Sequence, residues 1–301
     1  MKKVIVFTDA DLDGSMCYTL LKWCTTGNLP YKVTTVTKFR DDFIAWSRKN
    51  DVDSYDNIYI LDLDVSQTSM DLVDKKNITI IDHHATHVDN RDKYKHAKVY
   101  VTEYPSCAKL IYKMFKKTLN ETIDSNMKKL VLLVDDYDSW THKFPQSKKL
   151  NYLFWNYQGD RLEKFLKDFQ HGFKGFNEAQ TSIIDFYEKK LIKVTSNLQY
   201  FQAETSIQKQ QLRCVSTFVS TMISDIGNHL VDPKGLNADI GFVVNPETNR
   251  VSIRKNTNCT VHLGRLAQLL IDGGGHESAA GGVCTEKFLQ FSKLFTPYVT
   301  R

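Results

Sequence analysis

Acidic and imidazole side chains that could hold divalent metal ions follow four apolar runs in the first 140 residues of the sequence. Carboxylates at the end of an apolar run are costly unless a positive charge offsets theirs. Four such clusters therefore indicate metal ions at one edge of a sheet. The clusters are 9–13, Asp62, 82–84 and 135–138.

The first cluster has the pattern D-x-D-x-D-G and places Asp9, Asp11 and Asp13 on one side of the segment, if the segment stays extended beyond its strand. Gly14 allows tight backbone geometry before a helix. A Ca²⁺-binding loop is one alternative, but the glutamate at the twelfth position of an EF-hand is absent. Loop carboxylates without a metal are the other alternative.

The third cluster, Asp82-His83-His84, is more specific because it adds a nitrogen ligand to the carboxylates. Mixed nitrogen and oxygen sites suit Mn²⁺, Fe²⁺ or Zn²⁺, and oxygen-rich sites favour Mn²⁺ or Mg²⁺. Two ions about 3.5–4 Å apart need a bridging carboxylate, and Asp62 at the end of its strand suits that position. The last ligand position stays open among three carboxylates: Asp135, Asp136 and Asp138.

Strands and helices alternate through the first half of the chain. Continuously apolar, β-branched strands between helices predict a parallel α/β sheet covered on both faces. Ligands of such sheets bind outside the carboxyl ends of the strands, where the acidic clusters fall. The expected strands are 4–7, 32–37, 57–65, 77–84 and 98–103, and the main expected helices are 15–24, 106–117 and 126–137.

Changes in composition predict three parts. A metal-binding α/β domain covers 1–145. A helical connector, with a long helix over about 179–201, covers 146–211. A smaller C-terminal α/β domain covers 212–301 and contains the glycine-rich string GGGHESAAGG that begins at Gly273.

The order of these motifs resembles the DHH phosphoesterase family, and the GGGHESAAGG string is similar to the signature of its DHH-associated C-terminal domain. The resemblance covers both ends of the chain but not the connector. It implies hydrolysis of a phosphodiester by a catalytic metal-binding domain with a substrate-binding domain. The D-Y-D-S-W string at 136–140 is most similar to the oligoribonuclease (nanoRNase B-like) branch, which is related to RecJ-like exonucleases.

The resemblance also implies roles for the metal site. Asp9 and Asp11 would bind one divalent ion, Asp13 and His83 the other, and Asp62 would bridge both. Asp136 would complete the second site, with Asp138 as the alternative. The catalytic pair would be Asp62 and His84, with His84 against the scissile phosphate. The implied ions are two Mn²⁺, with Mg²⁺ as the alternative.

The C-terminal string would approach an anionic substrate closely through the backbone amides of Gly273, Gly274 and Gly275. His276 and Arg254 would add hydrogen-bond donors or positive charge. Ser106, just before an expected helix, has two interpretations: a contact to phosphate or the N-cap of that helix.

The implied function is two-metal phosphodiesterase action on short RNA or DNA oligonucleotides or small nucleotides, as in a nanoRNase-like exonuclease. The alternatives are a cyclic-dinucleotide or pAp phosphoesterase and a non-catalytic nucleotide-binding protein. The apolar runs are far shorter than the roughly 20 residues of a membrane span, so no membrane association is expected. The six scattered cysteines indicate free thiols and a cytoplasmic location. Family relatives suggest a homodimer.

Overall fold

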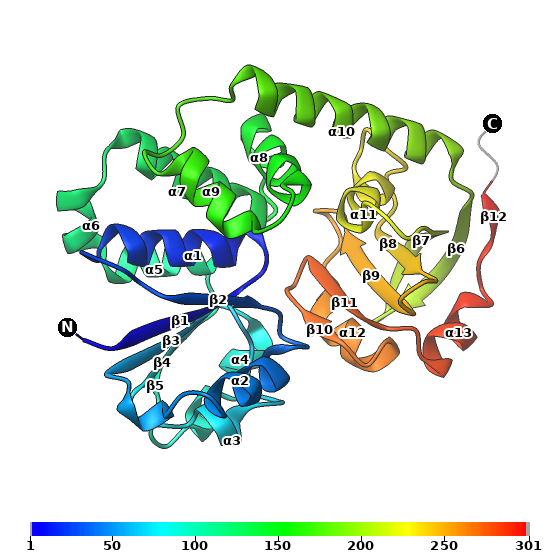
Figure 1. Cartoon of the computed structure of the whole chain (residues 1–301). Coiled ribbons are helices and arrows are strands. Elements are labelled where there is room, and N and C mark those ends of the chain that lie inside the picture. Colours follow the sequence, from blue (N-terminus) through cyan, green and yellow to red (C-terminus); the bar gives the residue numbers. More distant parts are fainter. Residues whose placement is uncertain (1, 299–301) are drawn as a thin grey trace. The chain divides into compact units, whose positions relative to one another are not determined.

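A computed structural model describes residues 2–298, which divide into two compact units between residues 184 and 185 (Figure 1). The first unit contains a five-stranded sheet and the second a seven-stranded sheet. Both sheets are covered by helices, so the α/β fold class with a smaller C-terminal domain is confirmed. Within the described residues, no helix combines the length and the apolar character needed to cross a membrane.

All strands of the first sheet are parallel, in the order β2-β1-β3-β4-β5. The central strands are apolar and buried, as expected for a sheet covered on both faces. Their carboxyl ends therefore meet at one edge. The strands are β1 (Val4–Asp9), β2 (Tyr31–Thr34), β3 (Asn57–Leu61), β4 (Ile78–Asp82) and β5 (Lys98–Val101).

Two groups of helices cover the two faces of this sheet (Figure 1). One group consists of α1 (Leu12–Trp23), α5 (Cys107–Met114), α6 (Lys116–Thr122) and α7 (Ser125–Asp138). The other group contains α2 (Phe39–Ser47), α3 (Met70–Val73) and α4 (Ala85–Val88), with two short 3₁₀ turns, η1 (Val52–Ser54) and η2 (Arg91–Lys93).

The segment expected as a helical connector, 146–211, is divided between the two units. Helices α8 (Pro145–Asn156) and α9 (Arg161–Phe169) belong to the first unit, where Phe165 of α9 is fully buried. Helix α10 (Glu178–Asn197) crosses the boundary and ends four residues before the expected position of 201. Strand formation at Tyr200 ends the helical segment.

The second sheet has the order β10-β11-β9-β8-β7-β6-β12, and among the described strands of this sheet only β7 and β8 pair in parallel. Its strands are β6 (Tyr200–Ile207), β7 (Gln210–Phe218), β8 (Ile240–Asn245), β9 (Arg250–Lys255), β10 (Gly274–Gly275), β11 (Ala279–Val283) and β12 (Thr296–Tyr298). Its helices are α11 (Ile223–Val231), α12 (Leu263–Leu270) and α13 (Glu286–Ser292).

Strands β6 and β7 form a hairpin that was not expected from the sequence. Ile207 pairs with Gln210, so the turn consists of Gln208 and Lys209 alone. Both turn residues have positive φ, 51° and 67°. Such two-residue turns usually contain Asn-Gly or another pair of residues that includes glycine. Without that signal the hairpin could not be predicted from the sequence.

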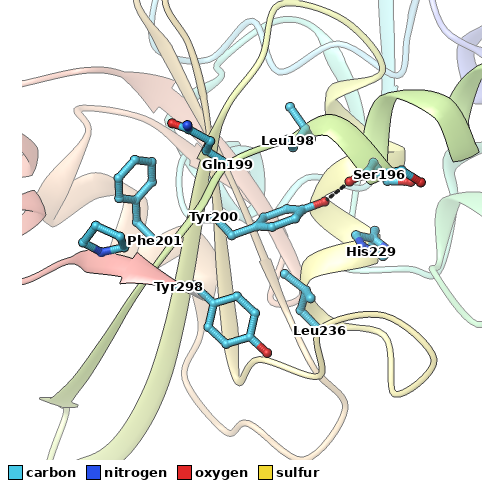
Figure 2. A pocket seen from close by; sticks show the side chains of 10 residues that line it. Ser196, Leu198, Gln199, Tyr200, Phe201, His229, Leu236 and Tyr298 are labelled. Carbon is cyan, nitrogen blue, oxygen red and sulfur yellow. Dashed lines mark hydrogen bonds between the residues drawn. The ribbon is translucent and has the colours of Figure 1, made fainter. Parts of the chain in front are cut away.

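A pocket of about 560 Å³ opens beside β6 and β12 in the second unit (Figure 2). Tyr200, His229 and Tyr298 are among its lining residues. The Tyr200 hydroxyl donates a hydrogen bond to the carbonyl oxygen of Thr195 at 2.7 Å, which ties β6 to the end of α10. None of the substrate-binding residues expected from the sequence lines this pocket.

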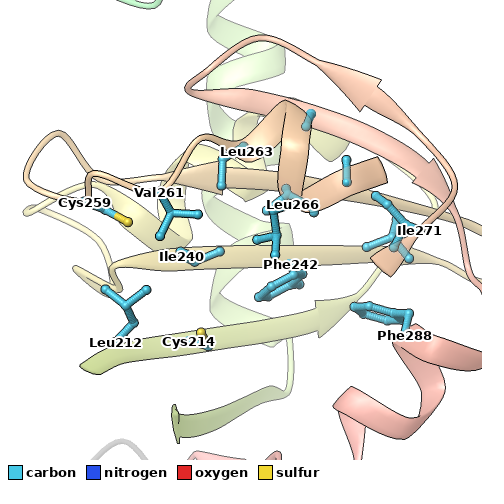
Figure 3. Packing of buried hydrophobic residues seen from close by; sticks show 14 of the residues in the cluster. Leu212, Cys214, Ile240, Phe242, Cys259, Val261, Leu263, Leu266, Ile271 and Phe288 are labelled. Atoms are coloured by element: carbon cyan, nitrogen blue, oxygen red, sulfur yellow. The ribbon is translucent and has the colours of Figure 1, made fainter. Parts of the chain in front are cut away.

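The main core of the second unit lies between its sheet and the helices α12 and α13 (Figure 3). Phe242 of β8 is fully buried at its centre, and its ring packs against Phe288 at a centroid distance of 5.7 Å. Ile240 and Leu266 belong to the same cluster. Burial of these apolar side chains stabilises the unit independently of any bound ion.

Replacing Phe242 with alanine should lower the free energy of unfolding by about 3–5 kcal/mol, because it removes a buried ring and leaves a cavity. Leu289→Ala is the matched control, since Leu289 is 53% exposed and should change stability by less than about 0.5 kcal/mol. Urea unfolding measures both changes. Equal effects of the two substitutions would contradict the assignment of this core.

Candidate metal centre

The carboxyl ends of three adjacent strands bring predicted ligands to one edge of the first sheet. Strand β1 ends at Asp9, β4 ends at Asp82, and Asp62 directly follows β3. These strands lie side by side in the order β1-β3-β4. This is the edge where parallel sheets bind ligands.

Asp62 turns the backbone at the end of β3 through an unusual conformation. Its φ is 58°, in the left-handed region, while its N–H still donates to the carbonyl oxygen of Ile81 at 2.9 Å. Aspartate tolerates this region better than most residues other than glycine. Strained backbone of this kind is found mainly at functional sites, where the surrounding structure holds it in place.

The expectation of an extended segment through Asp13 is not met, because α1 begins at Leu12. Asp11 is the N-cap of α1, and its Oδ1 accepts a hydrogen bond from the N–H of Gly14 at 2.9 Å. A Cβ atom at position 14 would lie only 2.5 Å from the carbonyl oxygen of Asp9. Glycine therefore lets the first turn of α1 approach the end of β1 closely.

Asp13 is buried in the first turn of α1 and is held by the start of α5. Its two carboxylate oxygens accept hydrogen bonds from the N–H groups of Cys107 at 2.7 Å and Ala108 at 3.0 Å. The N-terminus of a helix carries a partial positive charge that favours a carboxylate. The contact fixes Asp13 beside the sheet edge.

His83 joins three of the carboxylates. Its Nε2 lies 3.3 Å from Asp62 Oδ1, 3.5 Å from Asp138 Oδ2 and 3.8 Å from Asp13 Oδ2. Its Nδ1 lies 2.9 Å from the carbonyl oxygen of Tyr104, which can only accept a hydrogen bond. Nδ1 therefore carries a proton, and Nε2 faces the carboxylates, where a metal ion could take the place of the second ring proton.

Two carboxylate oxygens in this cluster fit a bound cation. Asp62 Oδ1 and Asp138 Oδ2 are buried and accept no hydrogen bond. Buried polar atoms without a donor are rare and call for an explanation such as an ion. Asp13, His83 and Asp138 each place one ligand atom within 4.8 Å of the others, so these residues could hold a divalent metal ion.

The raised pKa values of the carboxylates also indicate that the cluster lacks a compensating positive charge. Burial, with the charge of Asp11, raises the pKa of Asp9 to about 8. Burial and neighbouring carboxylates also raise the pKa values of Asp13 and Asp62 well above their usual range, and that of Asp138 to about 6. A divalent cation would offset this repulsion and keep the carboxylates ionised.

The structure separates Asp136 from this cluster and places Asp138 in it. Two hydroxyl groups and two backbone N–H groups from residues 141–147 donate to the carboxylate of Asp136, at 2.6–3.1 Å. Burial would raise the pKa of Asp136, but these hydrogen bonds outweigh it and lower the pKa. Asp136 caps the loop after α7, and the alternative, Asp138, is the residue that lies beside His83.

His84 lies beside the cluster and is held by Asp82. His84 Nδ1 is 2.7 Å from Asp82 Oδ1. Burial would lower the pKa of His84, but the charge and hydrogen bond of Asp82 raise it to about 10. A positively charged imidazole here suits an anionic phosphate.

Two residues that received no role from the sequence extend this arrangement. The other oxygen of Asp82 is 2.7 Å from Nδ1 of His87, whose Nε2 is 3.0 Å from the hydroxyl of Tyr94. The only sequence signal was a third histidine one helical turn after the Asp82-His83-His84 motif.

Ser106 is the N-cap of α5, as the capping interpretation predicts. Its hydroxyl oxygen accepts from the N–H of Lys109 at 3.2 Å and donates to Asp135 Oδ1 at 2.9 Å. Lys109 Nζ lies 2.7 Å from the other oxygen of Asp135. Asp135, one of the three candidates for the last ligand position, therefore links α7 to α5.

The expected substrate-binding residues of the C-terminal string lie in the second unit. Gly274 and Gly275 form β10, which pairs with β11. A Cβ atom at Gly273 would lie 2.0 Å from the carbonyl oxygen of Gly281, so these strands pack too closely for a side chain there. The N–H of His276 closes the turn by donating to the carbonyl oxygen of Ala279 at 2.8 Å.

Arg254 lies on β9 with an exposed fraction of 9%. Its guanidinium donates to the hydroxyl of Ser252 at 2.9 Å and to that of Ser224 at 3.2 Å. These hydrogen bonds fix the cation in the second unit.

No protein-family model matches the chain, and a search of curated proteins finds no match. Solved structures do match. The pGpG-specific phosphodiesterase PggH from Vibrio cholerae is 14% identical, with a TM-score of 0.53 over 97% of each chain. The DHH domain of a member of the S1p family of ribosomal proteins is 14% identical, with a TM-score of 0.62 over 97% of this chain and 86% of that chain. Exonuclease RecJ bound to manganese is 11% identical, with a TM-score of 0.54 over 97% and 88%.

The chain therefore has the fold of DHH-domain proteins, and the resemblance inferred from its motifs is confirmed at that level. Identities this low establish the fold alone. The activity has to be argued from the residues that the fold brings together.

Asp138 and Asp136 should respond differently to replacement by asparagine. Asp138→Asn removes a buried charge, so the metal-free protein should stay folded while its affinity for Mn²⁺ falls at least about 10-fold. Asp136→Asn weakens a hydrogen-bonded cap and should lower the free energy of unfolding by about 1–3 kcal/mol. Calorimetric titration with Mn²⁺ and urea unfolding measure the two effects. Loss of Mn²⁺ binding in Asp136→Asn alone would reverse the assignment.

The stability of the metal-free protein should fall as the pH rises from 5 to 8. The pKa values of Asp9 and Asp138, about 8 and about 6, lie above the unfolded value of about 3.9, so the folded state binds more protons in this window. The raised pKa of His83, about 10, acts in the same direction above its unfolded value.

Binding of a divalent ion releases those protons, so the stabilisation by Mn²⁺ should increase over the same pH window. Thermal melts of EDTA-treated protein, with and without Mn²⁺, measure both trends, and Asp138→Asn should flatten the metal-free slope. Metal-free stability that rises steadily between pH 5 and 8 would contradict this account.

Proposed function

We propose that this protein is a metal-dependent phosphoesterase that hydrolyses a phosphodiester bond in short oligonucleotides or small nucleotides. The observation that carries the proposal is the meeting of Asp13, Asp62, His83 and Asp138 at one sheet edge, with two buried carboxylate oxygens that accept no hydrogen bond. The similarity in fold to a pGpG-specific phosphodiesterase and to a manganese-bound exonuclease supports the same class of reaction.

In this proposal Asp9 and Asp11 would hold one divalent ion, and Asp13, His83 and Asp138 would hold the other. Asp62 would be shared by the two. When bound, the ions would neutralise charge on the phosphate and lower the pKa of the attacking water. Mn²⁺ is the expected ion, and Mg²⁺ is the alternative.

The side chains of the protein supply orientation and charge. The Tyr104 carbonyl keeps the proton of His83 on Nδ1, so that Nε2 faces the carboxylates. Asp82 holds the His84 ring through its Nδ1. His84 would place positive charge beside the scissile phosphate and stabilise the charge that develops there.

The second unit would bind the remainder of the substrate through Arg254, the 273–275 backbone and His276. Gly273 and its neighbours bring β10 close against β11, and the buried guanidinium would supply positive charge. Within this proposal, Ser106 acts by capping α5 and not by touching the substrate.

The alternatives are a cyclic-dinucleotide or pAp phosphoesterase and a non-catalytic nucleotide-binding protein. Of the related structures, PggH acts on pGpG and aligns over 97% of both chains, which favours linear dinucleotides as the first substrates to test. A homodimer in the cytoplasm completes the proposal, and sedimentation of the purified protein tests the dimer.

With Mn²⁺, the purified full-length protein should hydrolyse pGpG or another 5′-phosphorylated dinucleotide. The panel also contains pAp, cyclic dinucleotides, and RNA and DNA of two to ten nucleotides, and mass spectrometry identifies the products. Asp62→Asn should reduce kcat by at least about 100-fold, because Asp62 would contact both ions. Asp53→Asn is the matched control, since the Asp53 side chain is 76% exposed.

Wild-type protein that leaves every substrate intact while binding one of them would favour the non-catalytic alternative. Wild-type protein that neither binds nor hydrolyses any of them would remove the proposal.

A further inference from the structure

His87 is a fully buried histidine in the short helix α4, and both of its ring nitrogens have partners. Nδ1 is 2.7 Å from Asp82 Oδ2, and Nε2 is 3.0 Å from the Tyr94 hydroxyl. Asp64 Oδ1 lies 3.7 Å from the same Nδ1, and it accepts hydrogen bonds from the N–H and the hydroxyl of Ser66. His87 lies outside the set of residues expected to bind metal.

The Asp82 carboxylate is completely buried between two imidazole rings. Its Oδ1 is 2.7 Å from Nδ1 of His84, and its Oδ2 is 2.7 Å from Nδ1 of His87. Burial would raise the pKa of Asp82, but the charge and hydrogen bonds of the two histidines lower it well below the usual range. The carboxylate cannot rotate without breaking a hydrogen bond to a buried charged group, which costs free energy.

The proton positions follow from the partners. A charged carboxylate only accepts hydrogen bonds, so both histidines donate to Asp82 from Nδ1. Nε2 of His87 forms a hydrogen bond with the Tyr94 hydroxyl, which can donate or accept. The result is a continuous row of hydrogen bonds in which Tyr94 contacts His87, and His87 shares Asp82 with His84.

We propose that His87 is a positioning residue for the hydrolysis of phosphodiesters. It fixes the plane of the Asp82 carboxylate, and the fixed carboxylate holds the His84 ring where His84 meets the phosphate. This inference rests on the proposed function for its catalytic consequence, whereas the positioning of His84 can be measured without any turnover.

Three substitutions separate the two hydrogen bonds of His87. His87→Leu removes both. His87→Asn keeps a short amide donor for Asp82 but loses the contact with Tyr94. Tyr94→Phe removes only the phenol hydroxyl. His96→Asn is the matched control, because His96 is exposed.

The kinetic test uses full-length protein with Mn²⁺ and the best substrate found for the wild type. His87→Leu should lower kcat by about 10–100-fold, which is the usual effect of removing a side chain that orients a functional residue by hydrogen bonding. KM and the affinity for Mn²⁺ should stay close to wild type. His87→Asn should recover most of the lost kcat, and the kcat of Tyr94→Phe should fall below that of the wild type and stay above that of His87→Leu.

The structural test follows the Nδ1–H signal of His84 by NMR, in protein with Mg²⁺ because Mn²⁺ is paramagnetic. The signal is assigned by its absence in His84→Gln. It should move or broaden in His87→Leu and stay near its wild-type position in His87→Asn. This measurement still tests the positioning role if the wild type hydrolyses none of the substrates.

Two results would overturn the inference. One is a His84 signal that is unchanged in His87→Leu. The other is an equal loss of kcat in His87→Asn and His87→Leu, in proportion to their loss of thermal stability. That pattern would indicate a purely structural histidine. If His87→Leu fails to fold, the comparison of His87→Asn with Tyr94→Phe decides: wild-type kcat in Tyr94→Phe together with a shifted His84 signal in His87→Asn would also oppose the proposal.

Discussion

The repulsion among carboxylates buried at one edge of a parallel sheet is the constraint on which the first unit depends. Burial and the charge of Asp11 raise the pKa values of four carboxyl groups, those of Asp9, Asp13, Asp62 and Asp138. Adjacent parallel strands force this proximity, because their carboxyl ends coincide. A charge cluster of this kind opposes folding unless cations bind within it, so the same residues limit stability and create affinity for metal.

The surrounding elements restrain the side chains of the cluster by hydrogen bonds. Each restrained side chain still faces the other members of the cluster. The start of α5 supplies two N–H groups to Asp13, and the Tyr104 carbonyl fixes the ring of His83. Gly14 brings α1 against the end of β1. Rigid support of this type matters because a metal site loses affinity when its ligands can turn away.

The sequence predicted the parallel sheet, the strand ends and most of the residues that gather at the sheet edge, because these depend on local patterns. It could not decide between Asp136 and Asp138, which lie on the same helix and differ only in their tertiary partners: the loop at 141–147 caps Asp136. The β6–β7 hairpin escaped prediction because Gln208 and Lys209 carry no turn signal. His87 escaped because its role depends on Tyr94 and Asp82, which come together only in the fold.

The hydrogen bond between Asp13 and Cys107 joins residues 94 positions apart in the chain. Contacts of such long sequence separation form late in folding, since a large loop must close before they contribute any stability. The candidate metal centre therefore becomes complete only when β1, α1 and α5 have assembled. Ion binding would report the finished first unit and would protect it against unfolding, but it would not guide the early collapse of the chain.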